Sequence, residues 1–172
     1  MAQKYRMLGI EKLEIGEVGA DGAMGSTLAE LEAIVPDSVV FEIGEPEVGE
    51  ILIEGQDDPD VISIIRGGIK TVTAQIRDAS IEMMELFFGG TVATTIYSAP
   101  VKSTPIYQSV KITCESVDGK ALEISIPKVL VTAKLDGAAK ASDSGMISAS
   151  LKVLAPCDAS GVALSPYQWT FI

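Results

Sequence analysis

Apolar and polar side chains alternate along residues 106–135, and this alternation constrains the fold more than any other feature of the sequence. A period of two places successive side chains on opposite faces of a strand, so the pattern predicts half-buried β-strands. Asp118-Gly119 interrupts the alternation, and this dipeptide favours the two-residue turn of a β-hairpin. The apolar phase changes after Pro127, which indicates a β-bulge. The sequence therefore predicts a long hairpin with a bulge in its second strand.

Most of the remaining chain also favours strands. Val, Ile and Thr account for 44 of the 172 residues, and β-branched side chains are enriched in strands. Further strands are predicted at residues 10–15, 39–44, 48–54, 69–77, 146–155 and 167–172. Acidic turns are expected at residues 45–47, between two of these strands, and at residues 56–60. Residues 28–35 show a helical spacing of apolar side chains, which Pro36 would end.

One short helix is predicted among the strands, at residues 78–88. Apolar residues recur there at helical spacing, Asp78 is a suitable N-cap, and Gly89-Gly90 ends the helix. The predicted fold is therefore mainly β, a β-sandwich or barrel with one short α-helix.

Two segments contain small and flexible residues. Residues 16–27 are expected to form a flexible arm, because they contain four regularly spaced glycines: Gly16, Gly19, Gly22 and Gly25. Residues 136–145, rich in Gly, Ala and Ser, are expected to form a mobile loop. Neither a linker nor an internal repeat divides the chain, so residues 1–172 are interpreted as a single domain.

Acidic residues are concentrated in the first part of the chain. Residues 1–60 contain 15 of the 24 Asp and Glu residues and only three bases, whereas residues 61–172 contain nine acids and ten bases. The net charge of −11 argues against a nucleic-acid reader, which needs a basic surface. Apolar runs are too short for a membrane span. Acidic and apolar residues are interleaved between Asp37 and Ile65, which predicts strands with a strongly acidic surface.

The sequence contains no catalytic or metal-binding motif. His is absent, which excludes a Ser-His-Asp triad, a Cys-His pair and an imidazole metal site. Cys114 and Cys157 are too few for a disulfide framework or a zinc knuckle. Clustered carboxylates of the kind that Ca²⁺ binds occur at Asp57, Asp58 and Asp60, but a solvated acidic turn is the favoured interpretation. We therefore expect neither an enzyme nor a bound cofactor or metal.

Taken in order, these elements resemble the tail tube (major tail) proteins of bacteriophages. The resemblance includes the first strand and the glycine-rich segment, the acidic strands at residues 39–44 and 48–54, the strand at residues 69–77, the short helix ending in Gly-Gly, and a final run of strands with a Gly/Ala/Ser loop. It spans nearly the whole chain and depends on the order of the elements.

This resemblance implies a β-barrel-like fold with a flanking helix, assembled as hexameric rings that stack into a hollow tube. Each subunit would contribute strands to a β-lined channel through which double-stranded DNA passes without specific binding. The implied partners are further copies of the chain and other tail proteins, such as the tape measure, tail terminator and baseplate or tip proteins, with no membrane. The implied location is the virion tail, assembled in the host cytoplasm.

An acidic channel lining has a physical reason in such a tube. Basic residues would retain DNA through phosphate contacts, whereas acidic residues repel the phosphates and keep the gap hydrated. The residues predicted to line the channel or its rims are Glu42, Glu45, Glu47, Glu50 and Glu54. The residues predicted to contact the neighbouring ring are the four glycines of residues 16–27 together with Asp136, Gly137, Asp143 and Gly145.

Two other interpretations stay open at this point. The chain could form the related tube of a bacterial secretion or injection machine, which would share the fold and the ring. It could also be a monomeric β-sandwich binding module, although the aromatic content of 5% is low for such a role.

The loop at residues 136–145 gives a direct test of the ring-contact hypothesis. Deleting the loop is expected to preserve the fold of the monomer but to block polymerisation, because the contact with the next ring is lost. Circular dichroism checks the fold, and electron microscopy checks tube growth. Unchanged tube growth would remove this loop from the interface.

Overall fold

The computed structural model describes residues 9–51, 54, 61–137 and 145–172, and within them the chain is mainly β. The helical elements are one α-helix, α1 (Ile81–Phe88), and a 3-10 turn, η1 (Ala20–Gly22). The strands are β1 (Ile10–Glu17), β2 (Leu28–Glu30), β3 (Val40–Ile43), β4 (Glu47–Ile51), β5 (Val61–Arg66), β6 (Lys70–Ile76), β7 (Thr91–Ala93), β8 (Ile96–Ser98), β9 (Ile106–Cys114), β10 (Leu122–Asp136), β11 (Met146–Val153) and β12 (Gln168–Phe171).

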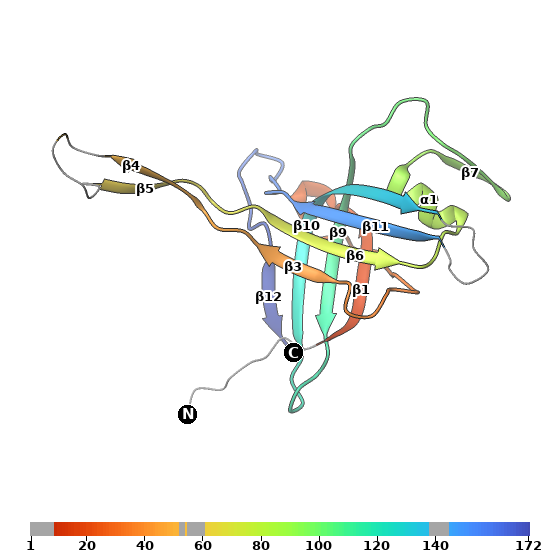
Figure 1. The fold of residues 1–172 in the computed structure, drawn as a ribbon, viewed down its shortest axis with the longest axis horizontal. Coiled ribbons are helices and arrows are strands. Elements are labelled where there is room, and N and C mark those ends of the chain that lie inside the picture. The colour runs from red at the N-terminus through yellow and green to blue at the C-terminus, as the bar shows by residue number, and fades with distance from the viewer. Residues whose placement is uncertain (1–8, 52–53, 55–60, 138–144) are drawn as a thin grey trace.

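The body of the molecule is one antiparallel sheet that folds over on itself. Its strand order is β2-β1-β9-β10-β11-β6-β3, and β12 also pairs with β10. Figure 1 shows β11, β6 and β3 crossing in front of β12, β10, β9 and β1, so the sheet forms two layers. This is the orthogonal type of sheet packing, in which one strand turns the corner between the layers. The expected mainly β fold is confirmed, and the described strands do not close into a barrel.

Strand β10 makes the corner, and a bulge at Pro127 allows it to do so. Before the bulge β10 pairs with β12, and after it β10 pairs with β11. In its register with β9, Ile126 is opposite Val110 and Val129 is opposite Gln108. Two residues of β10, Pro127 and Lys128, therefore lie opposite the single residue Ser109 of β9. Proline has no N–H to donate to the ladder. A bulge interrupts the ladder bonds, so proline is tolerated at this position. The predicted bulge is confirmed.

Ser109 holds the bulge in place through two hydrogen bonds. Its hydroxyl is fully buried, donates to the carbonyl oxygen of Pro127 at 2.7 Å, and accepts from the backbone N–H of Gly25 at 3.0 Å. The side chain thus connects the corner of the sheet to the glycine-rich segment that follows β1.

The core lies between the two layers and consists of aliphatic side chains from both. Its completely buried members come from β1, β6, β9, β10 and β11, and the largest are Leu13, Ile15, Ile76, Ile112, Ile124, Ile126, Ile147 and Leu151. The alternation predicted from the sequence therefore placed the buried faces of β9, β10 and β11 correctly.

The open edges of the two layers are connected in two ways. On one side Phe41 of β3 packs edge-on against Tyr167 and Trp169, with ring centroids 5.5 and 6.5 Å apart. On the other side the chain after β2 crosses from layer to layer: Leu31 donates to the carbonyl of Leu13 in β1, and Val35 donates to Gln75 in β6, both at 2.8 Å. The helical spacing noted at residues 28–35 is thus a misleading signal, because residues 28–31 bond to β1 and residues 33–35 bond to β6 and the residue that follows it.

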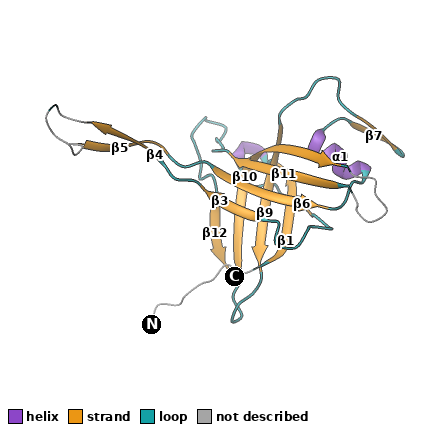
Figure 2. Ribbon diagram, in the orientation of Figure 1, coloured by secondary structure: helices purple, strands orange, loops and turns teal. Residues whose placement is uncertain are grey.

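Helix α1 lies at one end of the layers, beside the β7–β8 hairpin (Figure 2). Its N-cap is Ser80, whose hydroxyl accepts from the N–H of Met83 at 3.4 Å; Asp78 instead accepts from the N–H of Ser80 at 2.9 Å. The predicted cap was therefore two residues too early. The C-terminal stop at Gly89 is confirmed, with φ +70°.

Strands β3 and β4 do not form the expected hairpin around residues 45–47. Strand β3 pairs with β6, and β4 pairs with β5. Pro46 interrupts the strand without reversing the chain, because β4 continues away from the body (Figure 1). The expected turn at residues 56–60 lies outside the described residues, and strand β5 was not predicted.

Replacing Ser109 by alanine tests the role of the buried hydroxyl. The variant Ser109→Ala leaves a backbone N–H and a carbonyl without their partner, so the free energy of unfolding is expected to fall by about 1–3 kcal/mol. Urea unfolding followed by circular dichroism measures the change. Ser103→Ala, at an exposed loop position, is the control and should change stability by less than about 0.5 kcal/mol. Equal losses in the two variants would contradict the role assigned to Ser109.

Candidate functional site

A two-stranded arm projects from the body of the molecule. Strands β4 and β5, here called the hairpin arm, extend from the β3–β6 pair to one end of the longest axis (Figure 1). At the neck, defined here as residues 44–46 and 67–69 between the β3–β6 pair and the hairpin arm, the N–H of Gly44 donates to the carbonyl of Ile69 at 2.8 Å. A Cβ on Gly68 would lie 1.7 Å from the carbonyl oxygen of Gly44, so only glycine permits this close approach.

Both faces of the hairpin arm carry exposed aliphatic side chains. Val48 is opposite Ile64, and Glu50 is opposite Ile62, so these residues share one face. The side chain of Ile65 lies over Gly49 on the other face. The exposed fractions are 51% for Val48, 58% for Ile51, 62% for Ile62, 69% for Ile64 and 59% for Ile65. A lone two-stranded ribbon is marginally stable in water, and exposed apolar patches commonly mark interaction sites, so the arm is a candidate interaction surface.

The structure brings the five glutamates predicted to line a channel onto this arm and its base. Glu42 lies on β3, Glu45 at the neck, Glu47 and Glu50 on β4, and Glu54 beyond β4; all five are exposed. Glu47 is 4.0 Å from the Nε atom of Arg66 on β5. Both side chains are more than half exposed, and such surface pairs contribute little to stability.

The glycine-rich segment lies against the body rather than apart from it. Gly16 is part of β1, Gly19 directly precedes η1, and Gly22 is the last residue of η1. The N–H of Gly25 donates to the hydroxyl of Ser109. A Cβ on Gly22 would lie 2.4 Å from the carbonyl oxygen of Cys157, and one on Gly25 would lie 2.1 Å from that of Glu17. The glycines are therefore required for close packing, and their contact with a neighbouring ring stays a prediction.

The predicted loop at residues 136–145 is the connection between β10 and β11. Asp136 belongs to β10 and pairs with Met146, while its carboxylate lies 2.6 Å from the Nζ of Lys134. Gly137 and Gly145 flank the connection, and Asp143 lies outside the described residues. A deletion that preserves the β10–β11 ladder must therefore begin after Asp136. This end of the ladder and the hairpin arm lie at opposite ends of the molecule (Figure 1).

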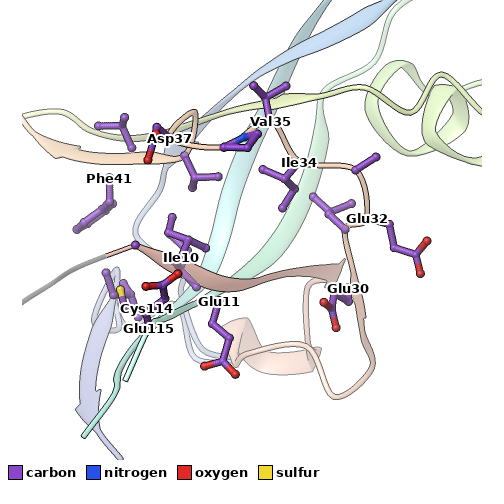
Figure 3. A pocket seen from close by; sticks show the side chains of 18 residues that line it. Ile10, Glu11, Glu30, Glu32, Ile34, Val35, Asp37, Phe41, Cys114 and Glu115 are labelled. Carbon is purple, nitrogen blue, oxygen red and sulfur yellow. The ribbon is translucent and has the colours of Figure 1, made fainter. Parts of the chain in front are cut away.

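A second candidate site is a pocket of about 780 Å³ at the open side of the two layers, here called the acidic pocket. It lies among β1, β3, the chain that joins β2 to β3, and the end of β9. In Figure 3 the side chains of Ile10 and Ile34 point into the space between the layers, whereas the carboxylates of Glu11, Glu30 and Glu32 point outward at the rim. Sequence analysis missed this pocket, because its walls come from segments distant in the chain.

Cys114 is part of the pocket floor and does not have the properties of a nucleophile. Its side chain is buried, and this burial raises the pKa of the thiol, which disfavours the reactive thiolate at neutral pH. Cys157 is exposed. The described residues contain no group of three or more Cys, Asp and Glu that could hold a metal ion. The candidate ligands Asp57, Asp58 and Asp60 lie outside the described residues.

No protein-family model matches this chain, and no curated protein matches its sequence. In the described part of the chain, no helix is long and apolar enough to cross a membrane.

Proposed function

We propose that this chain is a structural protein of a bacteriophage tail tube and polymerises as stacked, hexameric rings around an acidic channel. The observation that carries the proposal is the hairpin arm, whose aliphatic side chains are exposed on both faces. Burying a single isoleucine contributes about 1.5–3 kcal/mol, so covering this arm with a neighbouring copy would provide a large driving force for assembly. The order of elements that resembles tail tube proteins directs the proposal to a tube.

The positions of the candidate contacts support a head-to-tail arrangement. The hairpin arm and the Asp136–Met146 end of the β10–β11 ladder lie toward opposite ends of the longest axis (Figure 1). A contact between two different surfaces of the same chain repeats from copy to copy, and it generates a ring when the rotation closes or a filament when it does not. A tube of stacked rings needs both kinds of contact: one that closes each ring and one that repeats along the tube.

The acidic residues of the arm suit a channel for DNA. Glu47 and Glu50 are exposed beside the aliphatic residues that would be buried, so assembly would bring many carboxylates close to one another along the tube. Phosphates are repelled by such a surface, and DNA would slide without being retained. The tube of a bacterial secretion or injection machine would assemble in the same way. Binding of a tape measure or another tail protein would distinguish a phage tail from such a machine.

Negative-stain electron microscopy across a concentration series tests the assembly. The protein is expected to form rings or tubes with an open centre, and Ile64→Asp is expected to raise the concentration needed for assembly about tenfold or more, because a charge replaces a buried side chain. Val101→Asp is the matched control, since Val101 is also an exposed aliphatic residue but lies outside the arm. A protein that stays monomeric at every concentration would contradict the proposal and favour a monomeric binding module.

Reversing the charge of the arm tests the channel. The variant Glu47→Lys/Glu50→Lys is expected to form tubes that retain linear duplex DNA in a sedimentation assay at low salt and release it at high salt, because basic residues bind phosphates. Tubes of the original protein should retain none. Glu82→Lys/Glu85→Lys makes the same change in net charge at exposed positions of α1 and should behave like the original. Equal retention by the two variants would exclude the arm from the channel surface.

A further inference from the structure

The acidic pocket combines an apolar floor with an acidic rim. Its floor includes Ile112, Cys114 and Ile124, each no more than 1% exposed, and in Figure 3 the side chains of Ile10 and Ile34 point into the space between the layers. Pockets that enclose a small organic ligand span about 300–1,000 Å³. The volume of this pocket, about 780 Å³, lies within that range. A ligand with an apolar body would therefore bury surface on the floor.

Hydrogen bonds hold one wall of the pocket in place. This wall is the chain between β2 and β3, which bonds to β1 through Leu31 and to β6 through Val35. The hydroxyl of Ser38 adds two bonds, because it donates to the carbonyl of Val35 at 2.6 Å and accepts from the N–H of Gln75 at 3.2 Å. A ligand that enters a preformed pocket loses little binding free energy to ordering of the protein.

The charged residues that line the pocket are all acidic. None of the 18 lining residues is Lys or Arg, and the acidic ones are Glu11, Glu30, Glu32, Asp37 and Glu115. Lys12 balances part of this charge from outside the lining, since its Nζ atom lies 3.5 Å from a carboxylate oxygen of Glu30. Among the described residues, no ion pair engages Glu32 or Asp37. The rim therefore favours a cationic ligand.

The placement of the carboxylates favours an organic cation over a metal ion. The described residues contain no group of three or more Cys, Asp and Glu that could hold a metal ion, so the negative charge is distributed around the rim. In Figure 3 the carboxylates of Glu11, Glu30 and Glu32 point outward, away from the apolar floor. An ammonium group at the end of an apolar body would stay hydrated among such carboxylates while the body lies on the floor.

We propose that the acidic pocket binds a small organic cation with an apolar body, such as an arylalkylammonium ion. The body would contact Ile112, Ile124 and Phe41, and the ammonium group would lie at the rim. The acidic hairpin arm of a second copy is disfavoured as an occupant, because like charges repel. This proposal is independent of tube formation, since no residue of the hairpin arm lines the pocket.

A titration followed by methyl NMR tests the proposal on the full chain, labelled at its isoleucine methyl groups and kept below the onset of assembly. With phenylbutylammonium as the probe, the methyl signals of the lining residues Ile10, Ile34, Ile112 and Ile124 are expected to shift along one saturable curve. The signal of Ile62, exposed on the hairpin arm, should not shift. Phenylbutanol has the same body without the charge and is expected to bind about tenfold more weakly. Phenylbutyrate, with the opposite charge, should bind more weakly still.

Neutralising the rim separates its local charge from the overall charge of the protein. Glu11→Gln/Glu30→Gln/Glu32→Gln is expected to weaken the binding of phenylbutylammonium about tenfold and to leave the binding of phenylbutanol unchanged. The matched control makes the same change in net charge at exposed positions outside the pocket and should bind like the original; it is Glu17→Gln/Glu82→Gln/Glu85→Gln.

Four results would overturn the proposal. The signals of the lining isoleucines could stay unshifted, or the shifts could be confined to Ile62, which would place the probe on the hairpin arm. The alcohol or the carboxylate could bind as tightly as the ammonium compound, which would remove the role of the rim. The rim variant and its control could also lose affinity equally, which would make the attraction a property of the net charge alone.

Discussion

The fold depends on the bulge in β10, where a single strand serves both layers of the sheet. An antiparallel sheet with one apolar face must bury that face, and here it does so by folding over on itself at Pro127. The bend removes regular ladder bonds, and the buried hydroxyl of Ser109 replaces one of them while also holding the glycine-rich segment. The same bend positions β6 and β3 in the second layer, from which the hairpin arm extends.

The two candidate sites differ in their physical character. The hairpin arm is a projecting surface that is apolar on both faces, and its stability in water is limited because no part of the described chain covers it. The acidic pocket is a concave surface that arises where β1 and β3 belong to different layers, which the chain between β2 and β3 bridges.

Local patterns predicted most of the body. The hairpin of β9 and β10, with Asp118 and Gly119 both at positive φ, followed directly from the Asp-Gly signal, and the phase change located the bulge. The five acidic candidates were found from charge alone, and the structure places them on one arm and its base. Predictions failed where the partner of a segment decided its structure: residues 28–35 bond to two layers, and β4 pairs with an unpredicted strand instead of β3.

The sequence by itself determined the strand content, the buried faces of the central strands, the helix with its glycine stop, and the concentration of acidic residues before residue 61. These depend on residue type and on periods of two or 3.6 residues, which act over a few neighbours. Only the tertiary structure decided that β3 stays in the body while β4 pairs with β5 in a projecting arm, that aliphatic residues of the arm stay exposed, and that Ile34, Phe41 and Cys114 share a pocket. These features depend on contacts between distant segments, and local periodicity carries no information about which distant segments meet.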